Sequence, residues 1–188
     1  NRGKDVKKQA ANGVVDVNNM NIKTRNCLDH EKIKANVMAN LSQIRAWATI
    51  TKSSGEPLVI CAAGPSLADH IDEIKELQKN GAKIIAVKHA IDTLKLHGVK
   101  PYGVVLLDPR AHVEGFVKKP DTDCIWFVSS MVDPSVVKSL NDSKAKICGY
   151  HALVNAGETA CMLSTDVQVS GGSATATRSI GLFRDMFG

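Results

Sequence analysis

A Gly-Pro-Ser turn at residues 64–66 directly follows a short apolar segment, and its residue types suit the binding of a phosphate. Gly64 permits a close approach to the backbone, Pro65 fixes its own φ angle, and Ser66 is expected to cap a helix. A glycine-containing turn between a strand and a helix presents free backbone N–H groups to an anion. The turn therefore predicts a cradle for a nucleotide phosphate. An ordinary strand-to-helix turn is the alternative, because the stretch is neither a Walker A loop nor a complete G-x-G-x-x-G motif.

A second turn of this kind lies near the end of the chain and contains Gly171, Gly172 and Ser173. Small residues, together with the hydroxyl groups of Ser173 and Thr175, at the start of a predicted helix suit a phosphate or a carboxylate. Glu158 precedes this turn in a loop and is placed to reach the same cleft. The sequence therefore predicts two anion-binding turns.

Charged and polar residues follow three other predicted strands. Asp108, at the end of an apolar segment, is expected to hold Mg²⁺ against phosphate oxygens. Arg110 suits a bidentate contact with a phosphate, and Lys88 suits charge neutralisation. His151, or alternatively His89, is expected to act as an acid or base. The plainer interpretations are a solvated turn for Lys88 and His89, a loop cap for Asp108, a surface ion pair for Arg110 and packing for His151.

The elements that must position these residues alternate between strand and helix from residue 57 onward. The strand patterns are short, apolar and rich in Val and Ile, which predicts a parallel sheet covered on both faces. We expect a Rossmann-like, doubly wound α/β domain, in which ligands bind beyond the carboxyl ends of the strands. The expected strands are 58–62, 83–87, 103–107, 124–129, 145–150 and 166–170, and the expected helices are 67–79, 90–97, 135–140 and a last helix opened by residues 171–173.

Two segments precede this domain. Residues 1–28 lack a sustained periodicity and are interpreted as a basic N-terminal arm that docks a protein partner or a second copy of the chain. Residues 29–56 are interpreted as a helical extension and a loop, with a helix that begins at Asp29 and ends near Ala48. Residues 57–188 form the nucleotide-binding domain. Since a further strand is expected after the last helix, we expect either a piece of a longer protein or a trimmed form.

Composition narrows the choice of function. The 188 residues carry a net charge of +5, which helps to attract anionic substrates but is too diffuse to argue for nucleic acid. No apolar run approaches the length of a membrane span, and the N-terminus lacks the apolar region of a signal peptide. The five cysteines show no C-x-x-C spacing and are expected to be reduced thiols in a cytoplasmic protein.

Three motifs in order resemble the 6-hydroxymethylpterin diphosphokinase MptE-like family, which includes the bacterial motility accessory factors. They are Cys-Ala-Ala-Gly-Pro-Ser-Leu at 61–67, Lys-Pro at 100–101 before a strand that ends in Asp-Pro at 108–109, and Ser-Gly-Gly-Ser at 170–173. The resemblance covers about residues 58–188 and also extends to versions in bacteriophage genomes, whose function is generally unassigned. Many relatives have Gly where this chain has Ala62, which narrows the room at the first turn.

The resemblance implies a Rossmann-like domain and two alternative activities, of which we expect the first. The pterin enzyme implies Mg²⁺-dependent transfer of a diphosphate from ATP to the hydroxymethyl group of a small acceptor. The motility factors imply transfer of a nonulosonic sugar from a CMP-activated donor, a reaction that needs no divalent ion. A non-catalytic nucleotide-binding or virion-associated protein is the third hypothesis. In the first two, residues 64–66 and 171–173 would hold phosphates, and Asp108, Lys88, Arg110 and a histidine would act as described above.

Overall fold

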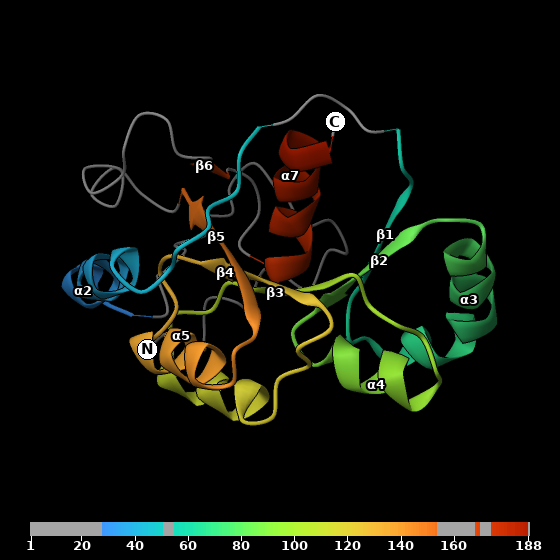
Figure 1. Ribbon diagram of the computed structural model, residues 1–188, viewed down its shortest axis with the longest axis horizontal. Coiled ribbons are helices and arrows are strands. Elements are labelled where there is room, and N and C mark those ends of the chain that lie inside the picture. Colours follow the sequence, from blue (N-terminus) through green and yellow to red (C-terminus); the bar gives the residue numbers. More distant parts are fainter. Residues whose placement is uncertain (1–27, 51–54, 154–167, 170–173, 188) are drawn as a thin grey trace, which may run out of the picture.

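A six-stranded sheet forms the centre of the computed structural model, which describes residues 28–50, 55–153, 168–169 and 174–187. The strands are β1 Leu58–Cys61, β2 Lys83–Val87, β3 Gly103–Leu106, β4 Ile125–Ser129, β5 Lys146–Ala152 and β6 Gln168–Val169. They lie in chain order across the sheet, and every neighbouring pair is parallel (Figure 1). The α/β class and the parallel sheet predicted from the sequence are therefore confirmed.

Helices cover both faces of this sheet. The connections between successive strands contain η3 Pro65–His70, α3 Ile71–Lys79, α4 Ala90–Leu96, η4 Ala111–Val117 and α5 Pro134–Asp142. Because the strands follow chain order, these connections all advance in one direction and place their helices on one face. The other face is covered by α2 His30–Leu41 and α7 Thr175–Phe187, which come before and after these connections (Figure 1).

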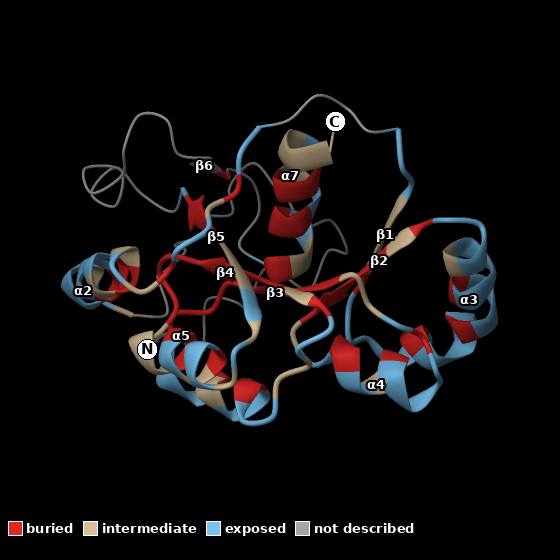
Figure 2. Ribbon diagram, in the orientation of Figure 1, coloured by how far each residue is buried: buried red, intermediate tan, exposed pale blue. Residues whose placement is uncertain are grey.

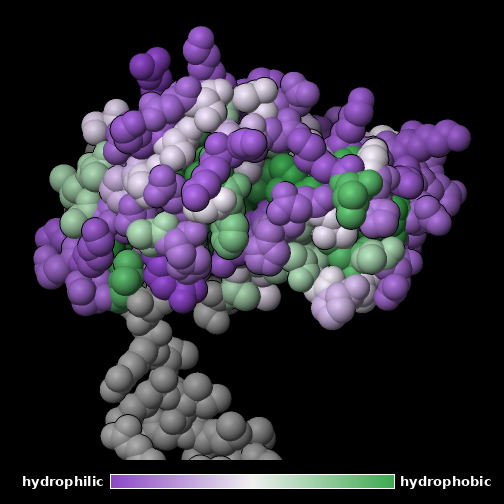
Figure 3. Space-filling model, turned by 90° about the horizontal axis from the view of Figure 1, so that it is seen from below, coloured by the Kyte–Doolittle hydropathy of each residue, from purple (hydrophilic) through white to green (hydrophobic). Residues whose placement is uncertain are grey.

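The strand residues alternate between two hydrophobic clusters. Ile84, Val104 and Trp126 point to the cluster that contains α3, α4 and α5. Their chain neighbours Ile85 and Val105 point to the cluster that contains α2 and α7. This period of two places apolar side chains on both faces, as a sheet buried on both sides requires. The central strands are accordingly buried along most of their length, and the outer surface of the α3–α5 layer is mostly hydrophilic (Figures 2 and 3).

Helix α2 is attached to the sheet by two buried asparagines one turn apart. Asn36 Nδ2 donates to the carbonyl oxygens of Pro109 and Met131, at 3.2 and 3.1 Å. Asn40 Nδ2 donates to the carbonyl oxygens of Ser130 and Val132, at 2.9 and 2.8 Å. These carbonyls belong to the segments that follow β3 and β4, where no strand partner takes them. The asparagines therefore place α2 at the carboxyl edge of the sheet.

The end of α2 differs from the prediction. Asp29 caps the helix as expected, because its carboxylate accepts from the Lys32 backbone N–H at 2.8 Å. The helix ends at Leu41, however, and not near Ala48. The chain then runs beside β5, where Ala48 donates to the Gly149 carbonyl at 2.7 Å and Gly149 donates to the Ala46 carbonyl at 2.8 Å. This pairing with a distant strand overrides the local helical pattern.

Three other predicted elements also changed. The helix expected at 67–79 begins as the 3-10 helix η3, and only residues 71–79 are α-helical. The loop expected after Asp108 contains the 3-10 helix η4. Strand β5 continues to Ala152 because β6 pairs with it at residues 151 and 152. The N-terminal arm lies outside the described residues, and no helix of the described part is long and apolar enough to cross a membrane.

Replacing Asn40 with alanine is expected to lower the free energy of unfolding by about 2 kcal/mol, because two buried carbonyls lose their donor. Met38→Ala on the same helix is the control, since the Met38 side chain is exposed. Urea denaturation monitored by circular dichroism measures both variants. Equal stabilities of the two variants would contradict the anchoring role of Asn40.

Candidate functional site

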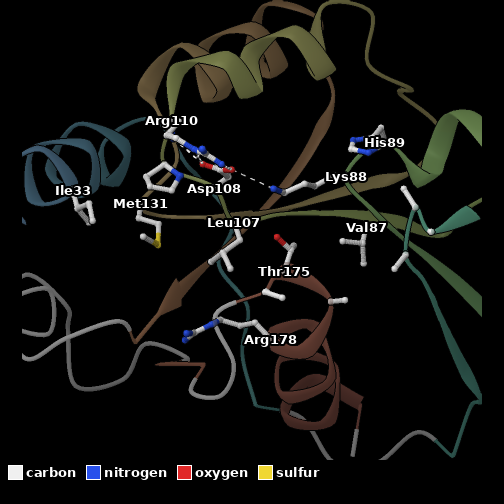
Figure 4. A pocket seen from close by; sticks show the side chains of 16 residues that line it. Ile33, Val87, Lys88, His89, Leu107, Asp108, Arg110, Met131, Thr175 and Arg178 are labelled. Carbon is white, nitrogen blue, oxygen red and sulfur yellow. Dashed lines mark hydrogen bonds and ion pairs between the residues drawn. The ribbon is translucent and has the colours of Figure 1, made fainter. Parts of the chain in front are cut away.

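A cavity of about 610 Å³ opens at the carboxyl ends of β1, β2 and β3. Residues at the ends of these three strands form most of its walls, and Met131 after β4, the start of α7 and Ile33 of α2 complete it (Figure 4). Its volume lies within the range of small-molecule sites, and its position is the one at which open parallel sheets bind ligands. The cavity therefore lies at the edge of the sheet where the predicted site residues were expected to meet.

A carboxylate between two cations occupies one wall. Arg110 donates through Nε to Asp108 Oδ1 at 2.9 Å and through Nη2 to Oδ2 at 2.6 Å. Lys88 Nζ donates to the same Oδ2 at 3.2 Å. The Arg110 side chain is half exposed, whereas that of Asp108 is 6% exposed. In this ionic cluster of three residues, the protein therefore buries the acid and presents the two cations to the cavity.

These contacts control the ionisation of Asp108. The Arg110 guanidinium, more than any other group, holds the pKa of this carboxyl well below its usual range, against the opposing effect of burial. The Arg110 backbone N–H, which donates to Oδ1 at 3.2 Å, and the Lys88 ammonium act in the same direction. Asp108 is thus a carboxylate at any ordinary pH and cannot serve as a proton donor near neutrality.

Lys88 adopts a backbone conformation that is uncommon for a side chain of its size. Its φ angle is +51°, in the left-handed region, while its N–H donates to the Val105 carbonyl at 3.1 Å. This conformation turns the chain at the end of β2 so that the Lys88 side chain reaches Asp108 across the cavity (Figure 4). Strained residues persist where surrounding structure holds them, frequently at binding sites.

Helix α7 brings two polar side chains to the opposite wall. Thr175, a predicted phosphate-binding residue, is the first residue of the helix and lines the cavity. Arg178, one turn later, also lines it, and its Nη1 donates to the carbonyls of Leu153 and Val169, at 2.9 and 2.6 Å. Arg178 was not predicted. Its spacing from Thr175 was the available signal, but its partners are backbone carbonyls 9 and 25 residues away, which no side-chain pattern reveals.

The donor set suits an anion better than a metal ion held by the protein alone. Asp108 is the single carboxylate among the described residues that line the cavity, and both its oxygens already accept from cations. No group of three His, Cys, Asp or Glu side chains in the described part is placed to hold a metal. Mg²⁺ usually takes one or two carboxylates together with phosphate oxygens and waters. The cavity alone therefore does not fit a protein-held Mg²⁺.

Most of the predicted site residues in the described part meet at this cavity. Gly64, Lys88, Asp108, Arg110 and Thr175 line it, and so does the alternative histidine His89. Gly64 has a φ angle of −83° and room for a side chain, so the protein's own backbone does not require a glycine there.

Two predicted residues of the described part do not line the cavity. Pro65 and Ser66 belong to η3, where no side chain caps the helix, so the expected capping by Ser66 is wrong. Gly171, Gly172, Ser173 and Glu158 lie outside the described residues, and their predicted roles stay predictions.

His151 is the second-last residue of β5, which continues to Ala152. It is 1% exposed, stacks on Trp47 with ring centroids 4.6 Å apart, and places Nδ1 2.9 Å from Ser130 Oγ. Strand β6 and the 46–48 segment pair along this edge of β5 and enclose the ring. The structure therefore gives His151 a packing environment away from the cavity, and His89 is the described histidine that lines it.

Comparisons with known proteins agree with this architecture. The model of a family described as 6-hydroxymethylpterin diphosphokinase MptE-like matches residues 35–187. Among solved structures, the MAf glycosyltransferase from Magnetospirillum magneticum AMB-1 has a similar fold, with a TM-score of 0.63 and 18% sequence identity. The similarity covers 83% of this chain and 26% of that one, so the chain spans about a quarter of that protein's length. No curated protein matches the chain.

Lys88→Gly is expected to weaken the binding of inorganic pyrophosphate about tenfold, the effect of one lost charge-assisted hydrogen bond. Lys144→Gly is the matched control, because Lys144 has a φ angle of +57° but lies away from this cavity. Glycine relaxes the backbone and removes an ammonium group at both positions, so the two variants differ in whether the lost ammonium lies at this cavity. Isothermal titration measures the affinity, and equal binding by the two variants would exclude Lys88 from the anion site.

Asp108→Asn is expected to destabilise the fold by about 1–3 kcal/mol at pH 7, with the difference shrinking below pH 4. The sign follows from the depressed pKa. Asp108 contributes stability above its unfolded pKa of about 4 and loses that contribution as the pH falls through its folded value. Urea denaturation between pH 3 and pH 7 measures the difference.

The exposed pair of Asp142 and Lys138 provides the control for this variant. Asp142→Asn is expected to change stability little, because solvent screens exposed pairs. A pH-independent loss in Asp108→Asn would show that shape, and not the charge of Asp108, carries the effect.

Proposed function

Because the chain belongs to the 6-hydroxymethylpterin diphosphokinase MptE-like family, we propose that it is a transferase that takes a nucleotide donor. The donor's phosphate would lie against Lys88 and Arg110, at the carboxyl edge of the sheet. The observation that carries this proposal is the arrangement of these two cations on the cavity wall with Asp108 behind them.

Phosphate binding would combine side chains with a helix terminus. Arg110 can turn its exposed N–H groups to phosphate oxygens without leaving Asp108, since a guanidinium has five donors. Thr175 stands at the N-terminus of the 13-residue helix α7, where free backbone N–H groups and the helix dipole favour an anion. Gly171, Gly172 and Ser173, which precede that terminus, would add further N–H groups. The donor would thus be held from β2, β3 and α7 at once.

An apolar wall would hold the uncharged parts of the substrates. Ile33, Val87, Leu107 and Met131 line the cavity beside the ionic cluster. Binding sites for small molecules usually combine such apolar surface with a few polar groups that fix orientation. Here the polar groups would fix the phosphate, and the apolar wall would exclude water from the reacting atoms.

The ionic cluster favours a sugar nucleotide such as a CMP-activated nonulosonic sugar. In this reaction an acceptor hydroxyl attacks the anomeric carbon, the bond from that carbon to the phosphate oxygen breaks, and CMP leaves with its electron pair. Lys88 and Arg110 would stabilise the negative charge on the leaving phosphate. His89 would take the acceptor's proton. The structure with a similar fold is that of a glycosyltransferase, which supports this choice.

Diphosphate transfer from ATP to a small hydroxylated acceptor is the second candidate, favoured by the family description. A triphosphate carries more negative charge than the two cations neutralise, so Mg²⁺ would enter with the nucleotide. Asp108 would then have to exchange one of its cation partners for the ion. The two candidates therefore differ in their dependence on Mg²⁺.

A thermal-shift screen of the 188-residue chain distinguishes them, with ATP, GTP, CTP, CMP and a CMP-sugar, each with Mg²⁺ or with EDTA. We expect CMP and the CMP-sugar to raise the melting temperature equally in both conditions, and Lys88→Gly to remove the shift. A shift by ATP that requires Mg²⁺ would support the diphosphokinase instead. No shift with any nucleotide would contradict the proposal.

A further inference from the structure

One exposed aromatic ring, that of Phe116, lies beside the cavity. The chain has two Trp, two Tyr and four Phe residues, and all of them lie in the described part. Phe116 is the most exposed of them, with 38% of its surface accessible. The remaining seven are buried or half-buried in the two hydrophobic clusters or against them.

Helix η4 positions this ring firmly. Val113 and Val117, on either side of Phe116 in the sequence, are fully buried in the α3–α5 layer. The helix is thus fixed to the core through its valines, while Phe116 faces outward. Its exposure is therefore a property of a well-anchored turn and not of a loose chain end.

Two imidazole rings flank Phe116. The His89 ring centroid lies 5.3 Å from that of Phe116 at an interplanar angle of 55°, and His89 itself lines the cavity. On the other side the His112 ring lies 6.2 Å away and nearly perpendicular. His112 Nε2 is in turn 4.0 Å from Asp108 Oδ2. The aromatic group therefore extends from the cavity wall to the ionic cluster.

We propose that Phe116 forms a stacking surface for the heteroaromatic base of the nucleotide donor. This inference rests on the proposed function, since it assigns the base of the donor whose phosphate lies at Lys88 and Arg110. Lys88 and His89 are neighbours in the chain, and the His89 ring lies beside that of Phe116. A ligand that contacts the Lys88 ammonium therefore comes within reach of the Phe116 ring. An aromatic ring tolerates any base, because every base offers a π face.

The site offers separate contacts for the phosphate and for the base of the donor. The cationic groups bind phosphate without regard to the base, so the base needs a contact of its own. A partly exposed Phe between two imidazoles offers a flat surface that a base can cover at little cost, because it has few polar groups to dehydrate. Covering the ring also removes exposed apolar surface from water.

The test compares ligands that share a phosphate but differ in the base. Isothermal titration measures the affinities of CMP, AMP and ribose 5-phosphate for the parent chain, Phe116→Ala and Phe116→Tyr. We expect Phe116→Ala to lose about tenfold in affinity for CMP and AMP, equivalent to about 1.4 kcal/mol. Its affinity for ribose 5-phosphate should be unchanged, and Phe116→Tyr should retain nucleotide binding. Leu96→Ala, which removes a highly exposed side chain from α4, is the control.

The other results overturn the inference in distinguishable ways. Equal losses for nucleotides and for ribose 5-phosphate would mean that Phe116 only supports the phosphate site by packing. Unchanged nucleotide affinity in Phe116→Ala would place the base elsewhere while leaving the proposed function intact. A parent chain that binds none of the three ligands would contradict the proposed function itself, and the stacking surface with it.

Discussion

The carboxylate of Asp108 can lie almost fully buried at a sheet edge only because two cations pair with it. An unpaired charge in this position would cost several kcal/mol. The pairing fixes Arg110 and Lys88 in return, since each must point toward the same acid from a different strand. Pro109, between Asp108 and Arg110, is held in addition through its carbonyl by Asn36 of α2. The segment after β3 is therefore fixed from both sides, and the cationic wall of the cavity is formed before any ligand arrives.

The order of the strands explains how α2 and α7 come to share this edge. Since all connections from β1 to β5 lie on one face, the second face is free for helices from outside that series. Helix α7 fills the middle of this face (Figure 1). Its first residues line the cavity, and α2 brings Ile33 to the same cavity (Figure 4). The segment that precedes the sheet in sequence is thus part of the site, and its asparagines are needed to place it.

The sequence predicted what depends on local pattern and missed what depends on distant partners. The strands were recognisable because their apolar runs are short and bounded by turns, and Lys88, Asp108 and Arg110 could be assigned to one edge because parallel strands end together. The 3-10 helices η3 and η4 have no distinctive periodicity over so few residues. His151 was expected at a strand end because residues 168–169 and Trp47, which extend and cover β5, are far away in the sequence. Arg178 and the two asparagines bond to carbonyls, which no side-chain pattern reveals.

Charge balance decides how such a site can handle a phosphate. The described lining contains Lys88, Arg110 and Arg178 against the single acid Asp108, so the cavity is positive before it binds anything. A divalent ion held there by the protein would add to that charge, whereas an anion reduces it. The strong preference of Asp108 for its cation partners, visible in its depressed pKa, works in the same direction. These terms together favour a donor whose single phosphate is neutralised by protein side chains, and they make a triphosphate dependent on a metal ion that it brings itself.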